Sequence, residues 1–236
     1  MTMAARPRQA IDLFYADAGS FDESAHADLI AAEDRAALSA STLPRRRAEH
    51  LAGRALLRFA LERKTGRPGV THQLRDGPNG KPECVDGPPF SVSHSGGLVV
   101  CALAPHGQIG VDVELPKRPR DVGSIAARYF SDEEARWVGT EPRRFFMLWV
   151  LKEAYLKALG VGLSGGLDTL RCRIERTRID AVARGGDTPA LALYEVADGF
   201  LALAGLGCEL GEVAAVQWSP RAPPRPAPLR LVARTL

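Results

Sequence analysis

The sequence predicts a globular protein that combines helices with short strands. Of its 236 residues 45% are hydrophobic, which is ample for a buried core, and the length fits one large domain or two small ones. Residues 45–64 and 143–159 carry apolar side chains at the three- and four-residue intervals of amphipathic helices. Short apolar or alternating segments, separated by turns that contain glycine and aspartate, indicate strands.

The predicted helices have recognisable ends. Gly66 with Pro68 follows the first, and Gly160 with Gly162 follows the second, as is typical of helix C-termini. Ser131 to Glu134 has the form of a capping box and predicts a further helix. Residues 21–38 also have helical spacing, and Pro44 is expected to end that region.

Eight segments are expected to be strands, and the most apolar of them is 98–104. The expected strands are residues 11–16, 90–94, 98–104, 109–114, 170–174, 191–196, 200–205 and 213–218. Residues 219–236 hold five prolines among arginines. This composition predicts an extended or loosely docked tail.

Composition narrows the class of protein. A formal net charge of +3 is too small to indicate a general nucleic-acid binder, although it is compatible with anionic substrates. The four cysteines are widely spaced and form no Cys-x-x-Cys pair, which favours reduced thiols over disulfides or a zinc site. No secretory signal and no apolar run of membrane-spanning length is found, so we expect a cytoplasmic protein without a membrane partner.

Basic residues gather in three places. The predicted helix 45–64 carries five arginines, which form either a solvent-exposed face or a binding site for phosphates. They are Arg45, Arg46, Arg47, Arg54 and Arg58. Lys81 lies in a turn rich in glycine and proline. Ser93 and His94 end a strand before a glycine pair, so they and the backbone N–H groups can face an anion, although a lone histidine is more often structural.

Acidic residues gather in two places. Asp112 and Glu114 are two residues apart on a predicted strand and therefore point to the same side. Their repulsion calls for a cation, so the pair indicates either a divalent-metal site or an edge strand with one solvent-exposed face. Glu153 and Lys157 are one helical turn apart, as in an ordinary surface ion pair.

The acidic and basic residues described above suit one type of reaction. The sequence has no P-loop, dinucleotide fingerprint, His-Glu-x-x-His pair or Gly-x-Ser-x-Gly elbow. Three carboxylates that suit Mg²⁺ and several cations that suit phosphates remain. This inventory fits displacement at a diphosphate, where a metal and positioned cations neutralise developing charge.

Five motifs in order resemble the Sfp-type 4′-phosphopantetheinyl transferases, including EntD-like members. They are Ala48-Glu-His-Leu-Ala-Gly-Arg54, Gly80-Lys-Pro82, Phe90-Ser-Val-Ser-His-Ser95, Gly110-Val-Asp-Val-Glu114 and Trp149-Val-Leu-Lys-Glu-Ala-Tyr-Leu-Lys157. Each motif alone is weak, whereas the last two in this order and separation are specific. One departure is Ser91, where many relatives carry Asn.

The resemblance implies an α+β fold of pseudo-twofold architecture, with the active site in the cleft between two similar subdomains. We expect a coenzyme A-binding half at 1–115, a second half at 116–218 with its hinge near 114–120, and the tail at 219–236. Asp112 and Glu153 would then meet from opposite halves.

The resemblance also implies an activity: Mg²⁺-dependent transfer of 4′-phosphopantetheine from coenzyme A to a serine of an apo acyl or peptidyl carrier protein, with release of adenosine 3′,5′-bisphosphate. Asp112, Glu114 and Glu153 become the metal ligands, directly or through water, and Mn²⁺ is an alternative ion. Glu153, itself or through a metal-held water, is the expected base, and Lys157 stabilises charge on the diphosphate. The coenzyme A ligands implied are Arg46, Arg54, Lys81, Ser93, His94 and Lys157.

Two other functions stay open at this stage. A non-catalytic module that binds carriers or coenzyme A would not need Asp112, Glu114, Glu153 and Lys157 together. Nucleic-acid binding through residues 45–47 and the tail lacks interleaved aromatic residues. We expect a monomer, and its carrier can belong to fatty acid, polyketide, nonribosomal peptide or siderophore synthesis.

Overall fold

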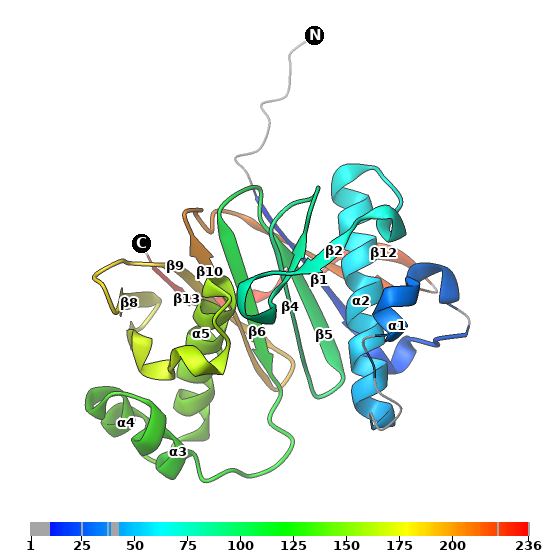
Figure 1. Ribbon diagram of the computed structural model, residues 1–236. Coiled ribbons are helices and arrows are strands. Elements are labelled where there is room, and N and C mark those ends of the chain that lie inside the picture. Colours follow the sequence, from blue (N-terminus) through cyan, green and yellow to red (C-terminus); the bar gives the residue numbers. More distant parts are fainter. Residues whose placement is uncertain (1–9, 25, 37, 39–42, 221, 236) are drawn as a thin grey trace.

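The computed structural model describes residues 10–24, 26–36, 38, 43–220 and 222–235. It confirms the α+β class, with two large sheets and a long helix packed on each (Figure 1). Helix α2 (Pro44–Thr65) covers the first sheet and helix α5 (Pro142–Leu159) covers the second. The chain therefore has two sheet-containing halves of similar construction.

The first sheet has five strands in the order β12-β11-β1-β5-β4. They are β12 (Ala222–Pro226), β11 (Val213–Ser219), β1 (Ile11–Asp17), β5 (Leu98–Leu103) and β4 (Phe90–Ser95). Only β1 and β11 run parallel, and the other neighbours are antiparallel. Strand β4 thus forms one edge of this sheet.

The second sheet has six strands in the order β6-β10-β9-β13-β8-β7. They are β6 (Gln108–Glu114), β10 (Gly199–Leu206), β9 (Ala190–Val196), β13 (Arg230–Arg234), β8 (Arg178–Ala183) and β7 (Leu170–Glu175). All neighbours are antiparallel except β13 and β8. Strand β6 forms an edge here, as β4 does in the first sheet.

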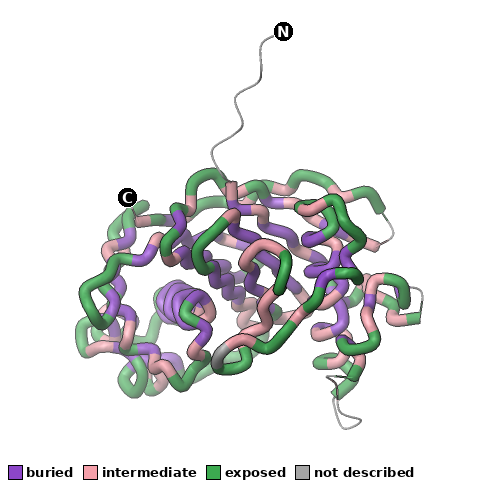
Figure 2. Tube along the Cα trace, turned by 45° about the horizontal axis from the view of Figure 1, so that its top comes forward, coloured by how far each residue is buried: buried purple, intermediate pink, exposed green. Residues whose placement is uncertain are grey.

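Alternating side chains divide the interior into layers. In β1, Leu13 joins a core formed by both sheets, whereas its neighbour Phe14 packs under α2. In β10, Leu203 joins the core between the sheets and Ala202 packs under α5. Because successive side chains of a strand point to opposite faces, a strand covered on both sides, such as β10, is apolar throughout. Figure 2 shows the buried residues concentrated in these strands and in α5.

The ends of both long helices follow the sequence signals. Gly66 and Gly160 adopt the left-handed conformation, with φ of 73° and 74°, and each donates its N–H to a carbonyl of the last helical turn. Pro44 does not end the preceding segment, because it begins α2, where a missing N–H costs no hydrogen bond. Helix α4 (Asp132–Val138) opens with the predicted capping box of Ser131 and Glu134, and α3 (Val122–Tyr129) precedes it.

The predicted helix over residues 21–38 is too long. Within the described part of this segment, only the 3-10 turn η2 (Ala27–Leu29) and the short helix α1 (Ala32–Ala36) are helical. Strand β8 and the small hairpin of β2 (Leu74–Asp76) and β3 (Pro82–Cys84) were not expected. No helix among the described residues combines the length and apolar character needed to cross a bilayer.

The C-terminal segment contains extended strands, as one of the two expectations had it, but these strands are paired in the sheets and are not loosely docked. Strand β12 pairs with β11 in the first sheet, and β13 inserts between β9 and β8 in the second. Prolines are compatible with β12 because it is an edge strand. The sheets also do not follow the expected division at 115, since β6 belongs to the second sheet and β11 to the first.

Gly110 sets how closely α5 approaches β6. A Cβ atom at this position would lie 1.9 Å from the carbonyl oxygen of Ala154 and 2.5 Å from the nitrogen of Ala158, both in α5. A glycine therefore lets the helix backbone rest on the strand and brings residues 153 and 157 toward residue 112.

We predict that Gly110→Ala lowers the free energy of unfolding by about 1–3 kcal/mol, because the added methyl group forces helix and strand apart. Urea denaturation measures the change. Gly211→Ala is the matched control, since a Cβ at Gly211 meets no atom within 4 Å. Equal midpoints for the two variants would contradict the close packing described here.

Candidate active site

The edges of the two sheets meet at β4 and β6, where serine hydroxyls join them. Ser91, Ser93 and Ser95 alternate along β4 and all face β6. Ser91 accepts a hydrogen bond of 3.0 Å from the N–H of Val111, and Ser93 donates one of 2.8 Å to Asp112 Oδ1. Ser91 thus helps to join β4 to β6.

Three acidic residues and one lysine lie beside the contact between β4 and β6. Asp112 and Glu114 lie on β6, Glu153 and Lys157 on α5, and all four line one hollow. Lys157 Nζ lies 2.7 Å from Asp112 Oδ1 and 2.7 Å from Ser93 Oγ. Asp112 and Glu153 therefore come from the same half, contrary to expectation, while β4 of the other half contributes Ser93.

Each acidic residue of the cluster makes the ionised form of its neighbours less favourable. Burial, and after it the charge of Asp112, raises the pKa of Glu153 to about 7. The same two causes raise the pKa of Glu114 above its usual range. Lys157 opposes both shifts. Without a further cation, the cluster therefore carries unfavourable repulsion.

The cluster fits a divalent cation of the Mg²⁺ type. Asp112 is buried, and its Oδ2 atom has no hydrogen-bond partner among the described residues, although Oδ1 bonds Lys157 and Ser93. A hard cation supplies the missing partner, since carboxylate oxygens are its preferred ligands. The ligand oxygens of the three acids do not all lie within 4.8 Å of one another, so a cation must draw Glu114 or Glu153 inward or hold it through water.

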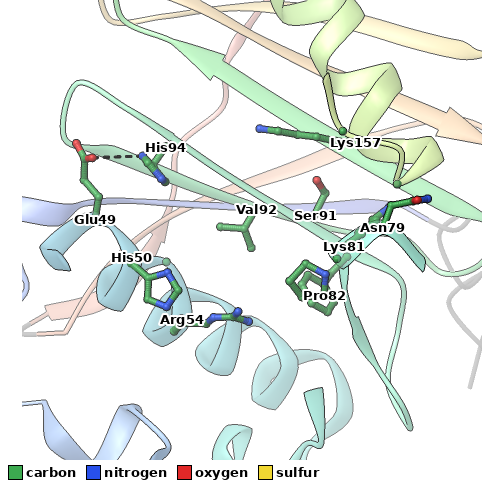
Figure 3. Close-up of a pocket in the computed structure, with 15 residues that line it drawn as sticks. Glu49, His50, Arg54, Asn79, Lys81, Pro82, Ser91, Val92, His94 and Lys157 are labelled. Atoms are coloured by element: carbon green, nitrogen blue, oxygen red, sulfur yellow. Dashed lines mark ion pairs between the residues drawn. The ribbon is translucent and has the colours of Figure 1, made fainter. Parts of the chain in front are cut away.

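Figure 3 shows a pocket of about 330 Å³, which shares Lys157 with the hollow of the acid cluster. It lies between α2, the turn before β3 and the end of α5. Its charged lining residues are Glu49, Arg54, Lys81 and Lys157, so cations prevail. Lys157, Val92 and His94 line both this pocket and the hollow of the acids, so the two spaces are neighbours that share Lys157 as a lining residue.

Sequence reasoning did not identify Glu49 and His50 as residues of this pocket. Glu49 is buried, and its carboxylate lies 3.3 Å from His94 Nδ1 and 3.1 Å from Arg45 Nε, so it orients His94 from α2 (Figure 3). His50 lines the pocket with a buried Nε2 atom that has no hydrogen-bond partner among the described residues. Burial, and then the charge of Arg54, lowers the pKa of His50. Both residues lie within the Ala48 to Arg54 motif, which was the available signal.

The predicted phosphate ligands are not all brought together. Arg54 lines the pocket, whereas Arg46 is exposed and is not among the lining residues. Lys81 lines it too, but its ammonium group donates to the carbonyls of Ile109 and Ala158, at 3.1 and 3.2 Å. Burial lowers the pKa of Lys81. Lys81 thus ties the turn to β6 and α5 in this structure.

Lys152 stabilises the fold and lies outside the acid cluster. It is fully buried, its Nζ atom lies 2.8 Å from Glu134 Oε1, and it donates to the carbonyls of Leu167 and Leu170. It faces away from the acid cluster and joins α5 to α4.

The chain is similar in sequence to known 4′-phosphopantetheinyl transferases. Residues 108–203 match the model of the 4′-phosphopantetheinyl transferase superfamily. A putative 4′-phosphopantetheinyl transferase of Synechocystis is 31% identical over 169 residues, which cover 68% of this chain and 69% of the relative. The chain belongs to the 4′-phosphopantetheinyl transferase superfamily. The matched region contains Asp112, Glu114, Glu153 and Lys157.

Other members of this superfamily match shorter stretches. The transferase HetI of Nostoc is 36% identical over 132 residues, 51% of this chain and 55% of the relative. The transferase Sfp of Bacillus subtilis is 38% identical over 104 residues, 41% of this chain and 45% of the relative. The chain thus spans about half the length of these two relatives. Membership confirms the resemblance found in the sequence and identifies an enzyme of the phosphopantetheinyl transferase class.

Proposed function

We propose that the enzyme takes 4′-phosphopantetheine from coenzyme A and attaches it, with Mg²⁺, to a serine hydroxyl of an apo acyl or peptidyl carrier protein. The serine oxygen bonds to the phosphorus that carries the pantetheine arm. The bond from this phosphorus to the bridging oxygen of the diphosphate breaks, and adenosine 3′,5′-bisphosphate leaves. The observation that supports this reaction most is that Lys157 joins a cationic pocket to a cluster of three acids.

The two spaces suit the two substrates. The nucleotide of coenzyme A fits the cationic pocket, where Arg54 and His94 can bind phosphate oxygens. The diphosphate then lies at the junction, within reach of Lys157 and Ser93. The carrier serine approaches from the side of Glu153, so the groups that react meet where the two spaces join.

Asp112, Glu114 and Glu153 would hold the metal. A bound Mg²⁺ supplies charge neutralisation at the phosphate oxygens. Lys157 remains paired with Asp112 and adds a second positive charge beside the diphosphate. Ser93 accepts from Lys157 and donates to Asp112, which fixes the ammonium group in place.

Glu153 is the proposed base for the serine proton. Burial and the charge of Asp112 raise the pKa of Glu153 to about 7 without a metal, and a bound cation would favour the ionised carboxylate, which is the form that accepts a proton. The rigid helix α5 holds Glu153 one turn from Lys157. One helix thus carries the group that removes the proton and the group that stabilises the phosphoryl charge.

The alternative functions have less support. Two arginines of the proposed nucleic-acid surface are paired, Arg45 with Glu49 and Arg47 with Glu23. A non-catalytic module has no need for a buried, unpartnered carboxylate oxygen beside a lysine. As proposed, the enzyme acts as a cytoplasmic monomer on carriers of fatty acid, polyketide or nonribosomal peptide synthesis.

Mass spectrometry of the carrier tests the proposed function. An apo carrier incubated with the enzyme, coenzyme A and Mg²⁺ should gain the mass of one phosphopantetheine on its serine. A panel of acyl and peptidyl carriers should include at least one substrate. An unchanged mass for every carrier, with coenzyme A still bound, would instead identify a binding module.

We predict that Arg54→Ala raises the KM for coenzyme A by about 10- to 100-fold, the effect of losing a hydrogen bond to a charged group, with little change in kcat. Arg46→Ala is the matched control, because Arg46 lies on the same helix but outside the pocket lining. It should change the KM by less than about twofold. Steady-state kinetics measures both, and a larger effect for Arg46 would place the nucleotide elsewhere.

A further inference from the structure

We propose that His72, Cys84 and Asp86 form a Zn²⁺ site, separate from the acid cluster. In the described part of the chain, they are the trio of histidine, cysteine or acidic residues whose ligand atoms all lie within 4.8 Å of one another. Imidazole, thiolate and carboxylate together are typical Zn²⁺ ligands, whereas Mg²⁺ prefers oxygen alone.

The distances between the ligand atoms match a tetrahedron. A tetrahedral Zn²⁺ separates nitrogen from oxygen ligands by about 3.4 Å, and sulfur from either by about 3.6 Å. In the structure, His72 Nδ1 lies 3.4 Å from Asp86 Oδ1. Cys84 Sγ lies 3.7 Å from His72 Nδ1 and 3.8 Å from Asp86 Oδ1. An ion can therefore bind all three with little movement.

Hydrogen bonds give His72 the tautomer that a metal requires. Its Nε2 atom lies 3.0 Å from Thr65 Oγ1, and this hydroxyl donates to the carbonyl of Leu61 at 2.8 Å. Thr65 must then accept from Nε2, so Nε2 carries the proton and Nδ1 keeps its lone pair. A second partner of this kind orients most histidines that bind metals.

A buried arginine holds the backbone at His72 in place. Arg58 is buried and donates to the carbonyls of His72 and Gly69, at 2.6 and 3.3 Å. It also pairs with Asp34 at 3.2 Å. A Cβ at Gly87 would lie 2.5 Å from Cys84 Sγ, so the glycine leaves room for the backbone beside the sulfur.

The guanidinium group of Arg67 occupies the space beside His72 and Asp86. Arg67 Nη2 lies 3.0 Å from His72 Nδ1 and 2.7 Å from Asp86 Oδ2. The Arg67 side chain is 49% exposed and can swing into solvent. Cys84 also lines a hollow of about 260 Å³, which gives an ion a path to the sulfur. Arg67 therefore competes with the metal for the same lone pairs.

A metal here would act on the nucleotide pocket through the β2–β3 hairpin. His72 precedes β2, Cys84 ends β3 and Asp86 follows it, so the ion would link both ends of the hairpin. Lys81 lies in the connecting turn and lines the pocket. Zn²⁺ should therefore slow amide hydrogen exchange in residues 74–84.

Metal binding to the tag-free full chain tests the site. Equilibrium dialysis against Zn²⁺, followed by elemental mass spectrometry, should give one ion per chain, and Co²⁺ should produce a thiolate-to-metal charge-transfer band. Cys84→Ser should weaken Zn²⁺ binding by about a hundredfold or more and abolish that band. Cys208→Ser, which changes a cysteine outside the cluster, should leave both unchanged.

Arg67→Ala provides a test in the opposite direction. Removing the competing guanidinium should tighten Zn²⁺ binding by about two- to fivefold, the equilibrium factor of an exposed ion pair. Circular dichroism confirms that each variant is folded. Zinc uptake that is the same in Cys84→Ser as in the unaltered chain, or weaker in Arg67→Ala, would overturn the site.

Discussion

Glu153→Gln is expected to lower the rate of phosphopantetheine transfer by about a thousandfold, or about 4 kcal/mol of transition-state stabilisation. The substitution removes the proposed base and one proposed ligand of the metal while keeping the size of the side chain. Carrier mass spectrometry under single-turnover conditions measures the rate. Glu209→Gln, at an exposed carboxylate, is the control and should retain full activity. Activity of Glu153→Gln within tenfold of the unaltered enzyme would remove Glu153 from the reaction.

The same substitution should stabilise the metal-free protein. A carboxyl whose pKa is raised from 4.5 to about 7 costs stability as pH rises through that range, and the cost is complete above pH 7. In EDTA at pH 8 we expect Glu153→Gln to melt about 2–4 °C higher, which corresponds to about 1 kcal/mol for a chain of this length. At pH 4.5 the difference should vanish. A lower melting temperature at pH 8 would contradict the repulsion inferred for the cluster.

Lys152→Met is expected to destabilise the fold by about 3–5 kcal/mol, because it leaves Glu134 as a buried charge without its partner. The melting temperature should fall by about 10 °C. Below that temperature transfer should stay within about tenfold of the unaltered rate, since Lys152 faces away from the acid cluster. Lys157→Met, on the same helix, should lose activity, and with Mg²⁺ present it should destabilise the fold less than Lys152→Met, because Lys157 is partly exposed and a cation can replace its charge beside Asp112.

A second substitution tests the pairing itself. Glu134→Gln removes the charge and keeps one acceptor oxygen, which can serve the capping box or the N–H of Cys172, so Lys152→Met combined with Glu134→Gln should be more stable than Lys152→Met alone. Chemical denaturation of the single and double variants gives the coupling energy. Strictly additive losses would show that Lys152 and Glu134 are not an energetically linked pair.

Local signals explain why so much of the fold was predictable. The ends of α2 and α5 depend on Gly66 and Gly160, and the start of α4 depends on Ser131 and Glu134, all of which act within one helical turn. Partners that are distant in sequence were not predictable. Strand β13 lies between β9 and β8 although its own five residues carry two arginines, so only its neighbours make it a strand.

The candidate site shows the same limit. The motifs identified Asp112, Glu114, Glu153 and Lys157, because their spacing on one strand and one helix fixes the direction of each side chain. They did not reveal which arginine enters the pocket, since Arg46 and Arg54 differ only in what the fold places opposite them. They also could not show that β6 and α5 belong to one half, which depends on sheet pairing.

The mass of an apo carrier after a single turnover tests the central claim most directly. With coenzyme A and Mg²⁺ the unaltered enzyme should convert the carrier to its phosphopantetheinylated form, while EDTA or Glu153→Gln should leave the apo mass on the same time scale. Conversion that proceeds equally well in EDTA and in Glu153→Gln would contradict a reaction centred on the acid cluster beside Lys157.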